Sequence, residues 1–424
     1  MRIRTDWKGA VCLGLSLAVF SLAACGGPGG PAVSHLSKRA FVSDDFDGSL
    51  HIENAASDVE SGFTIATGNQ PGTMVLSPDK SITLVFDAGD VQLAVVSNSS
   101  ESVLGRILLP NVSTGYVSMA DNTVGFVAVP NCPAASCSGF SNVVEVVDLA
   151  TTFNVTGTVP IAQVATTLVL SPTEKKLLVF GGPGDHQDTL TVIDVAAAQT
   201  TPATAATQLA SPSFDRPVSA VFSSDGTKAF ILNCGAECGG SAASVTVLDL
   251  TTTPPTPGAP IPVMAATTGL LNGSTLYVAG SPLGFGCAGA SPATTATSCG
   301  TLQAVDTGTL TAGAPITITD GSHDHMELGS DNQLFIGART CTNVSTMSET
   351  RGCLTIFGTV TSKVVVPPVN FDVTGIAPIS SRTIVYVVQG GELKIYDTST
   401  SPPSLTPTQI DVVGKAVDVK YVDK

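Results

Sequence analysis

The residue types with the greatest chemical capacity stand together in one short stretch, His323-Asp324-His325-Met326-Glu327. Two imidazoles beside a carboxylate can bind a transition-metal ion or supply a general base. A histidine pair this close together is also typical of a solvated loop in which one ring makes a local hydrogen bond. His323, Asp324 and His325 are therefore candidate catalytic residues, and the two histidines are candidate ligands of a divalent metal ion.

Other polar residues are candidates for the same or a separate site. Asp215-Arg216 and Asp372 directly precede apolar segments, so we expect them near a common binding site, with Arg216 as a further catalytic candidate. A lone Asp-Arg pair is equally typical of a structural ion pair. The stretch Asp185-His186-Gln187-Asp188 has carboxylates that suit a hard cation, but it lacks EF-hand spacing, and a polar loop tip is the better interpretation.

Motifs for common enzyme chemistries are absent from the sequence. There is no Gly-x-Ser-x-Gly elbow, phosphate-binding loop, His-Glu-x-x-His or dinucleotide fingerprint. The sequence indicates no cofactor beyond the divalent metal considered above. With 19 basic and 34 acidic residues, the chain has a formal net charge of −15 and no basic run, which argues against nucleic acid as a partner.

A repeated unit organises most of the chain. One copy runs from Pro217 to Leu232 as two strands joined by a turn at Asp225-Gly226, and a third strand follows from Ser244 to Asp249. Third strands like Ser244–Asp249, each ending on a polar residue or glycine, recur with a period of about 49 residues. The clear copies end at Asp148, Asp194, Asp306 and Asp397, and weaker copies end at Asn54, Asn98 and Gly358. Aspartates that recur in this way suit turn hydrogen bonds better than one active site.

Units of this length with four short strands are typical of β-propeller blades. The chain resembles the YVTN and WD40-like propellers of bacterial secreted proteins, which belong to a superfamily that also contains lactonase-like enzymes. The resemblance is carried by Leu276-Tyr-Val-Ala-Gly280, Leu76-Ser-Pro-Asp79 and the strand-ending aspartates. It implies an all-β fold of four-stranded blades, but little about function, because propellers host many unrelated activities.

The two ends of the chain predict how the propeller closes. The segment Ser37–Val42 has the pattern of a second strand, so the first blade lacks an inner strand. Ala416–Val422 has the pattern of an inner strand and follows a segment, Gln409–Val413, that we expect to be the outer strand of the last blade. The C-terminal strand is therefore predicted to pair into the N-terminal blade. We favour eight blades, with seven as the alternative if the first repeat is not a true blade.

The cysteines after the N-terminal segment fall in pairs within single repeats, between the second and third strands. An even number of cysteines in an exported chain favours disulfides. The repeat register selects one pairing, which is Cys132–Cys137, Cys234–Cys238, Cys287–Cys299 and Cys341–Cys353. A metal site is the poorer alternative, because these short spacings on separate blades do not converge on one tetrahedral ion.

The N-terminus has the pattern of an export signal. Arg2, Arg4 and Lys8 precede an uncharged segment from Gly9 to Ala24, which is short for a membrane span. Leu22-Ala-Ala-Cys25 resembles the lipobox of bacterial lipoproteins. The resemblance implies a signal peptide at 1–24 and acylation of Cys25, followed by a flexible Gly/Pro-rich tether in 25–34 and the propeller domain in 35–424. Gly26 after the cysteine resembles the pattern of outer-membrane lipoproteins.

Two functions remain open from the sequence. We favour a monomeric, non-enzymatic propeller that binds a protein, peptide or glycan at the cell envelope. It contacts the membrane only through its lipid anchor and faces either the periplasm or the cell surface. Long, disulfide-braced loops on a rigid scaffold support this interpretation. The alternative is a lactonase-like or metal-dependent enzyme whose site at the channel mouth contains His323, Asp324, His325 and Arg216.

Overall fold

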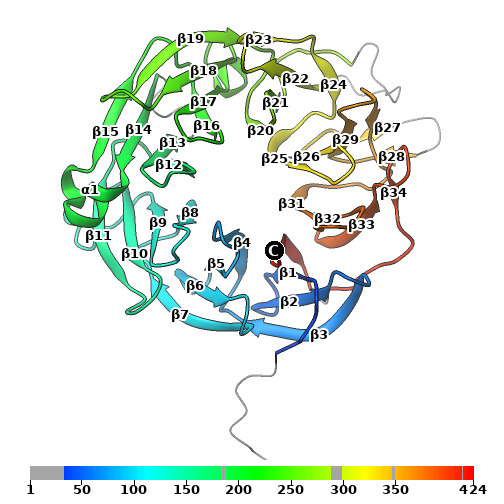
Figure 1. Cartoon of the computed structure of the whole chain (residues 1–424), viewed down its shortest axis with the longest axis horizontal. Coiled ribbons are helices and arrows are strands. Elements are labelled where there is room, and N and C mark those ends of the chain that lie inside the picture. Colours follow the sequence, from blue (N-terminus) through cyan, green and yellow to red (C-terminus); the bar gives the residue numbers. More distant parts are fainter. Residues whose placement is uncertain (1–32, 183–184, 186–187, 288–297, 346–348, 413) are drawn as a thin grey trace, which may run out of the picture. The chain divides into compact units, whose positions relative to one another are not determined.

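The computed structural model describes residues 33–182, 185, 188–287, 298–345, 349–412 and 414–424. Residues 33–424 form one compact unit. Its strands make eight radially arranged antiparallel sheets, and the chain passes through them in order around a ring (Figure 1). The signal-peptide, lipidation and tether predictions for 1–32, including Cys25, lie outside the described residues.

Each of the first four blades contains four strands, which follow one another from the channel outward. The first blade contains β35 (Ala416–Tyr421), β1 (Arg39–Asp44), β2 (Ser49–Asn54) and β3 (Val59–Ala66). The second contains β4 (Pro71–Leu76), β5 (Ile82–Asp87), β6 (Gln92–Ser97) and β7 (Ser102–Leu108). The third contains β8 (Gly115–Ser118), β9 (Val124–Val129), β10 (Val143–Asp148) and β11 (Val155–Pro160). The fourth contains β12 (Ala165–Leu170), β13 (Lys176–Gly181), β14 (Thr189–Asp194) and β15 (Ala206–Ala210).

The remaining blades follow the same plan with small additions. The fifth contains β16 (Pro217–Phe222), β17 (Lys228–Asn233), β18 (Ser244–Asp249) and β19 (Thr256–Pro262). The sixth contains β20 (Thr268–Asn272), β21 (Thr275–Gly280), β22 (Gly300–Asp306), β23 (Thr311–Ala312) and β24 (Ile316–Ile318). The seventh contains β25 (Ser322–Leu328), β26 (Gln333–Arg339), β29 (Leu354–Gly358) and β30 (Val364–Val365). The eighth contains β31 (Val373–Pro378), β32 (Ile384–Gln389), β33 (Glu392–Asp397) and β34 (Ser404–Leu405). Outside the blades are α1 (Val195–Thr200), η1 (Pro202–Thr204), η2 (Gly235–Cys238), β27 (Val344–Ser345) and β28 (Thr350–Arg351).

The residue pattern of each strand follows its place in the blade. Second and third strands are mostly buried, and β5 is buried along its whole length, because neighbouring blades cover both faces. The outer strand β3, by contrast, exposes five of its eight residues. Hydrophobic clusters therefore lie between successive blades, and one joins β32 and β33 to β1 and β35. Each blade is stable only with a neighbour on both sides, so the ring must be complete.

The ring closes as predicted, with eight blades. The C-terminal β35 pairs antiparallel with β1, with Val42 opposite Val419 and Ala40 opposite Tyr421. The first blade thus takes its inner strand from one end of the chain and its other three strands from the opposite end. The prediction of an outer strand at 409–413 was wrong: β34 takes that place, and Ile410 makes only an isolated bridge with Leu393. Two prolines, Pro402 and Pro403, directly precede β34.

The two faces of the ring differ in their connections. We call the face that carries the loops between second and third strands the loop face; these loops include 130–142, 234–243 and 340–353. Disulfides in the structure join Cys132–Cys137, Cys234–Cys238, Cys287–Cys299 and Cys341–Cys353, each within one such loop. These are the four pairs that the repeat register predicts. On the opposite face, aspartates at the ends of third strands accept backbone hydrogen bonds, as Asp148 does from Ala150 and Thr151.

Candidate functional site

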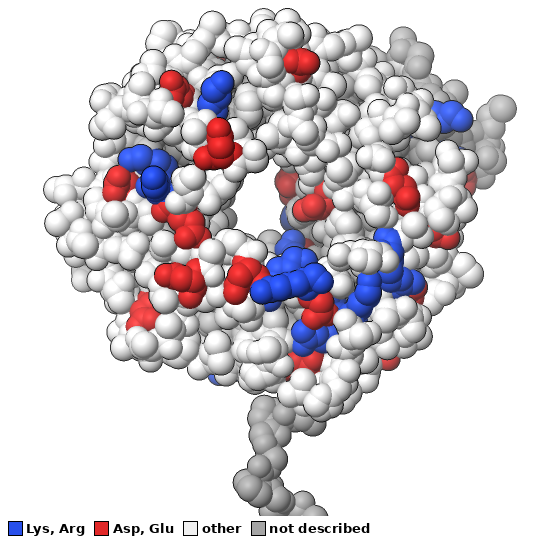
Figure 2. Space-filling model, viewed as in Figure 1, with Lys and Arg blue, Asp and Glu red and all other residues white. Residues whose placement is uncertain are grey.

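The mouth of the central channel on the loop face is the candidate site. Three adjoining hollows line it, with volumes of about 280, 380 and 530 Å³. The first hollow is formed by the second to fourth blades, the next by the fourth to seventh, and the largest by the seventh, eighth and first. Figure 2 shows the ring in space-filling form from one face, with its centre open. Volumes of this size suit small ligands or one end of a larger one.

Hydroxyl side chains form much of this mouth. Because each inner strand starts at the loop face, its first residues reach the rim, and small polar residues recur at these positions. The hydroxyl-bearing residues that line the hollows are Thr73, Ser113, Thr114, Thr166, Thr167, Ser219, Thr267, Thr268, Ser322 and Thr374. Several of these hydroxyls, such as those of Thr114 and Thr267, donate to backbone carbonyls and keep their lone pairs free to accept from a ligand.

A carboxylate joins a histidine to an arginine between two of the hollows. Asp324 accepts from His325 Nδ1 at 2.6 Å through one oxygen and from Arg339 Nε at 2.6 Å through the other. Burial raises the pKa of Asp324, but these two hydrogen bonds outweigh it and hold the pKa below its ordinary value. The ionised carboxylate fixes the tautomer of His325 with Nδ1 as donor, which leaves Nε2 for a ligand.

His323, the other histidine of the sequence motif, has a different environment. A bulge between His323 and His325 shifts the register of β25, and His323 is only 2% exposed. Neither ring nitrogen has a partner with hydrogen-bond geometry. Burial lowers the pKa of His323 to about 4, so the ring is neutral at physiological pH. A Cβ at Gly300 would lie 2.7 Å from the ring, which explains the glycine there. His323 therefore packs under the mouth, beside the sixth blade, and is a poor base.

The largest hollow contains an exposed aromatic ring beside two cations. Phe371 is 66% exposed and has φ of 78°, a conformation that non-glycine residues rarely adopt. Arg339 and Lys415 line the same hollow, and Lys415 Nζ lies 3.1 Å from Asp45. Strained backbone at an exposed aromatic residue is typical of a functional surface.

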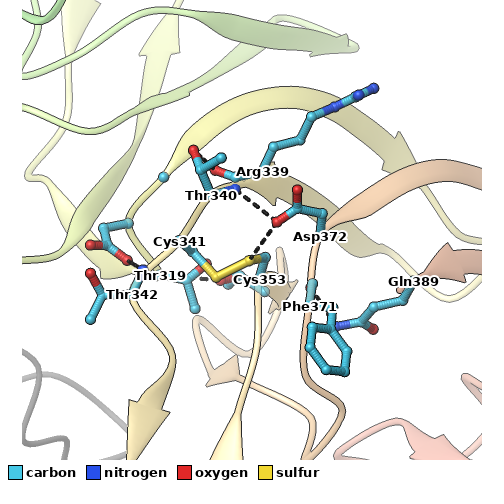
Figure 3. Close-up of a disulfide and its surroundings, with 12 residues drawn as sticks. Thr319, Arg339, Thr340, Cys341, Thr342, Cys353, Phe371, Asp372 and Gln389 are labelled. Atoms are coloured by element: carbon cyan, nitrogen blue, oxygen red, sulfur yellow. Dashed lines mark hydrogen bonds between the residues drawn. A yellow bond between two sulfur atoms is a disulfide. The ribbon is translucent and has the colours of Figure 1, made fainter. Parts of the chain in front are cut away.

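A disulfide supports this hollow from below (Figure 3). Asp372 Oδ1 accepts from the backbone N–H of Thr340 at 2.8 Å, and its carboxylate also contacts Cys353. The Gln389 amide donates to the Phe371 carbonyl at 3.3 Å. Asp372 thus fixes the position of the segment that carries Arg339 relative to the segment that carries Phe371. Asp372 was predicted as a binding residue, and in the structure its hydrogen bond to Thr340 positions these two segments.

Asp215 and Arg216 line none of the three hollows. Asp215 accepts from the backbone N–H groups of Ser241 and Ala242, each at 2.8 Å, and so holds the disulfide loop of the fifth blade. Arg216 is 9% exposed and donates to the Gly239 carbonyl at 3.3 Å, while its Nε and Nη1 have no partner. The two side chains make no ion pair with each other. Of the 185–188 stretch, His186 lies outside the described residues, and Asp185 accepts from the Val164 backbone N–H.

Two glutamates add carboxyl groups to the site, Glu327 inside the channel and Glu237 in the hollow of 380 Å³. Glu327 lies in the channel near Lys420 and Lys80, and the surrounding protein raises its pKa despite these cations. Glu237, from η2, lines the hollow of 380 Å³. Burial raises the pKa of Glu237, opposed by a hydrogen bond from the Ser281 backbone N–H at 2.8 Å. Both carboxyl groups are available as hydrogen-bonding groups within a largely neutral surface.

Sequence reasoning missed Arg339, Phe371, Lys415 and Glu237. Arg339 ends β26, Lys415 directly precedes β35, Phe371 lies two residues before β31, and Glu237 lies in the loop after β17; these register positions were the signal that could have found them. Among the described residues, His323 and His325 belong to no group of three metal-ligand side chains. No helix in the part of the chain that the structure describes is long and apolar enough to cross a membrane.

Comparisons with known proteins bear on the fold. No family model matches the chain, and no curated protein matches it by sequence. Among solved structures, it is similar to the dihydro-heme d1 dehydrogenase NirN, with a TM-score of 0.65 and 12% identity over 91% of this chain and 75% of that one. AztD from Citrobacter koseri gives a TM-score of 0.54 and 10% identity over 91% and 97% of the two chains. Hydrazine synthase from Kuenenia stuttgartiensis gives 0.51 and 14%, over 87% and 92%.

These similarities show a β-propeller fold. At such low identity they carry no residue of a relative's site over to this chain.

Proposed function

We propose that this protein is a lipid-anchored binding scaffold of the bacterial cell envelope, and that its channel mouth holds a glycan. The observation that carries the proposal is the combination at the mouth of many hydroxyl groups, the Asp324–His325–Arg339 chain and the exposed Phe371. Sugar hydroxyls both donate and accept, so carboxylate, guanidinium and hydroxyl groups can pair with them at once. An exposed aromatic ring supplies a flat apolar face for a sugar ring.

A glycan fits this mouth better than a protein or peptide does. Both cations of the largest hollow are already paired, Arg339 with Asp324 and Lys415 with Asp45, so they offer no free positive charge to select an acidic peptide. The rigid, braced loops also present a concave surface divided into hollows, which suits a branched or bent polyol better than an extended strand. A protein or peptide partner is the competing outcome of the test.

The binding proposal is tested with the full-length mature protein and a panel of soluble envelope glycan fragments and peptides of similar size. We expect a glycan to bind, and Arg339→Ala and Phe371→Ala each to weaken its Kd by about tenfold, equivalent to about 1.4 kcal/mol. Arg106→Ala and Phe46→Ala are matched controls, because Arg106 bonds to the Thr67 carbonyl outside the mouth and Phe46 is 82% exposed elsewhere. Binding only to peptides, or unchanged affinity in the mouth variants, would contradict the proposal.

Attachment through lipid is the second part of the proposal and rests on the Leu22–Cys25 pattern. Cys25→Ala removes the acylated sulfur, so the variant is expected to lose membrane association while the propeller still folds. Fractionation of cells and mass spectrometry of the N-terminal peptide measure this. A wild-type N-terminus without an acyl group, together with membrane retention of the variant, would argue for another anchor.

One observation supports the enzymatic alternative. Asp324 orients His325 in the manner of a general base, with Arg339 close enough to stabilise a developing anion. A lactonase-like reaction would use these residues, and His323 and Arg216 would stay outside the reacting groups. Turnover of a lactone panel that disappears in His325→Ala, with glycan binding absent, would favour the enzyme.

A further inference from the structure

The β1–β2 hairpin of the first blade contains a second cluster of side chains that can bind a ligand, with Asp44 at the end of β1, Asp47 in the loop and His51 in β2. Asp44, Asp47 and His51 each place one ligand atom within 4.8 Å of the others. His51 Nε2 lies 3.0 Å from Asp47 Oδ2 and 3.8 Å from Asp44 Oδ2. These residues line none of the hollows described above.

One carboxylate oxygen of the cluster is buried without a partner. Asp44 is fully buried. Its Oδ1 accepts from the backbone N–H groups of Phe46, at 2.8 Å, and Lys415, at 3.2 Å. Its Oδ2 has no hydrogen-bond partner and faces the His51 ring at a distance too long for a hydrogen bond. A buried carboxylate oxygen is costly to leave unpaired, so such an atom indicates a bound ion or water.

The end of the chain packs closely around the same oxygen. Gly414 has φ of 128°, and a Cβ at this residue would lie 2.2 Å from Asp44 Oδ2. Only glycine leaves the space beside the carboxylate open. The ammonium group of Lys415, the residue after Gly414, pairs with Asp45, with Nζ 3.1 Å from Asp45 Oδ2. No lysine or arginine among the described residues forms an ion pair with Asp44, Asp47 or His51.

We propose that Asp44, Asp47 and His51 form a site for a divalent transition-metal ion of the zinc class. Two carboxylates and an imidazole are ligands that such ions accept, and three protein ligands leave a fourth position for water. Ligand atoms around a tetrahedral zinc are about 3.3 Å apart when each metal–ligand distance is about 2.0 Å. The observed separations of 3.0 and 3.8 Å bracket that value. The Asp47 side chain is 37% exposed, which gives the ion a path from solvent.

The ion would also act on ring closure. Asp44 ends β1 at the point where its register with β35 shifts, and it holds the Lys415 backbone at the start of β35. Metal binding would therefore fix the β1–β2 loop against the C-terminal strand. Because an ion that binds only the closed ring stabilises it, zinc is expected to raise the melting temperature.

The test is titration of the metal-free, untagged mature protein with zinc by calorimetry. We expect one equivalent to bind at this site, with affinity reduced at least tenfold in Asp47→Ala and His51→Ala and unchanged within twofold in Asp45→Asn, the neighbouring carboxylate outside the cluster. Asp47 is exposed, so its variant should fold even if changes at Asp44 do not permit folding. Absence of zinc binding, equal affinity in all variants, or loss only in His325→Ala would overturn the proposal.

Thermal unfolding gives an independent measurement. At zinc concentrations about 100 times the Kd, we expect the melting temperature of the wild-type protein to rise by roughly 3 °C. The Asp47→Ala variant should show no rise, and Asp45→Asn should behave as the wild type does. A zinc-induced rise of the same size in Asp47→Ala would place the ion elsewhere and contradict the site.

Discussion

At the residue scale, carboxyl groups in this protein have two distinct roles that depend on their surroundings. Aspartates at strand ends and in turns, such as Asp148 and Asp225, accept hydrogen bonds from neighbouring residues, which hold the pKa of each well below its ordinary value. Glu53 is the opposite case, because it is fully buried and neither of its oxygens has a partner. Burial, with a smaller effect of Glu60, raises its pKa to about 8.

The raised pKa of Glu53 predicts a specific pH dependence of stability. Below about pH 4.5 the group is protonated in both the folded and the unfolded chain. As the pH rises from there to about 8, the unfolded chain releases this proton and the folded chain keeps it, so the free energy of unfolding falls by up to about 1.4 kcal/mol per pH unit. Glu53→Gln should remove this loss, and the variant should gain stability relative to wild type between pH 5 and pH 8.5.

Urea unfolding at these two pH values measures the effect. Glu392→Gln is the control, because the Glu392 side chain is 70% exposed and lies in a β-strand of the eighth blade. Parallel pH profiles for wild type and Glu53→Gln would show that Glu53 is not protonated in the folded protein.

At the scale of elements, the disulfide loops position the mouth residues more than they hold the blades together. At the start of the Cys341–Cys353 loop, the backbone N–H of Thr340 donates to Asp372. This hydrogen bond holds the seventh blade to the segment that leads into β31 of the eighth blade. The blades are stabilised by the hydrophobic clusters between them, which contain few cysteines. Closing loops of these lengths contributes about 2–3 kcal/mol each, small beside the burial between blades.

Opening single disulfides should therefore change binding before it changes folding. In a Cys341→Ser/Cys353→Ser variant, we expect loss of protection from hydrogen exchange in 340–353, a propeller core that remains folded, and weaker ligand capture. Cys287→Ser/Cys299→Ser should act in the same direction, because this bridge lies beside Gly300 and the His323 ring. Cys132→Ser/Cys137→Ser is the matched control, since its loop is remote from Arg339 and Phe371. Equal binding loss in all three variants would refute the placement of the site.

At the scale of the whole molecule, the C-terminal strand holds the ring closed through charged as well as apolar contacts. Arg39 of β1 pairs with Asp423 and, at 3.0 Å, with Glu101 of the second blade. Asp418, in β35, accepts from the Met74 backbone N–H at 2.8 Å, which links the first blade to the second. Lys80 lies over the Tyr421 ring, 4.7 Å from its centre. Apart from the Arg39–Glu101 pair, these contacts depend on the last ten residues.

Deleting residues 415–424 should accordingly destabilise the entire propeller. The deletion exposes the inner edge of β1 and the apolar sides of the eighth and second blades, so we expect aggregation or a fall in melting temperature of more than about 10 °C. Removal of Lys424 alone is the control, because that residue is exposed and ends beyond the strand. Thermal unfolding and size-exclusion chromatography distinguish the two truncations. A 415–424 deletion as stable as the full chain would mean that β35 does not close the ring.

The sequence by itself determined the blade plan of this protein. The repeated strand–turn–strand unit, its Asp-Gly turn and the strand-ending aspartates are local patterns, so they predicted four-stranded units, the C-terminal inner strand and the cysteine pairs inside single loops. The one strand placed wrongly, at 409–413, lies in a segment where an isolated bridge at Ile410 replaces a regular ladder. There the local pattern was weak, and the contacts made by the rest of the blade decided the pairing.

Only the tertiary structure decided which side chains meet. His323 and His325 are two residues apart in sequence, yet a bulge buries one ring and leaves the other at the channel mouth. Arg339 and Phe371 come from different blades, and Asp44 meets the backbone of Lys415 across 371 residues of sequence. Such contacts depend on the order of blades around a closed ring and on the direction in which each inner strand starts, and no local pattern of residue types contains that information.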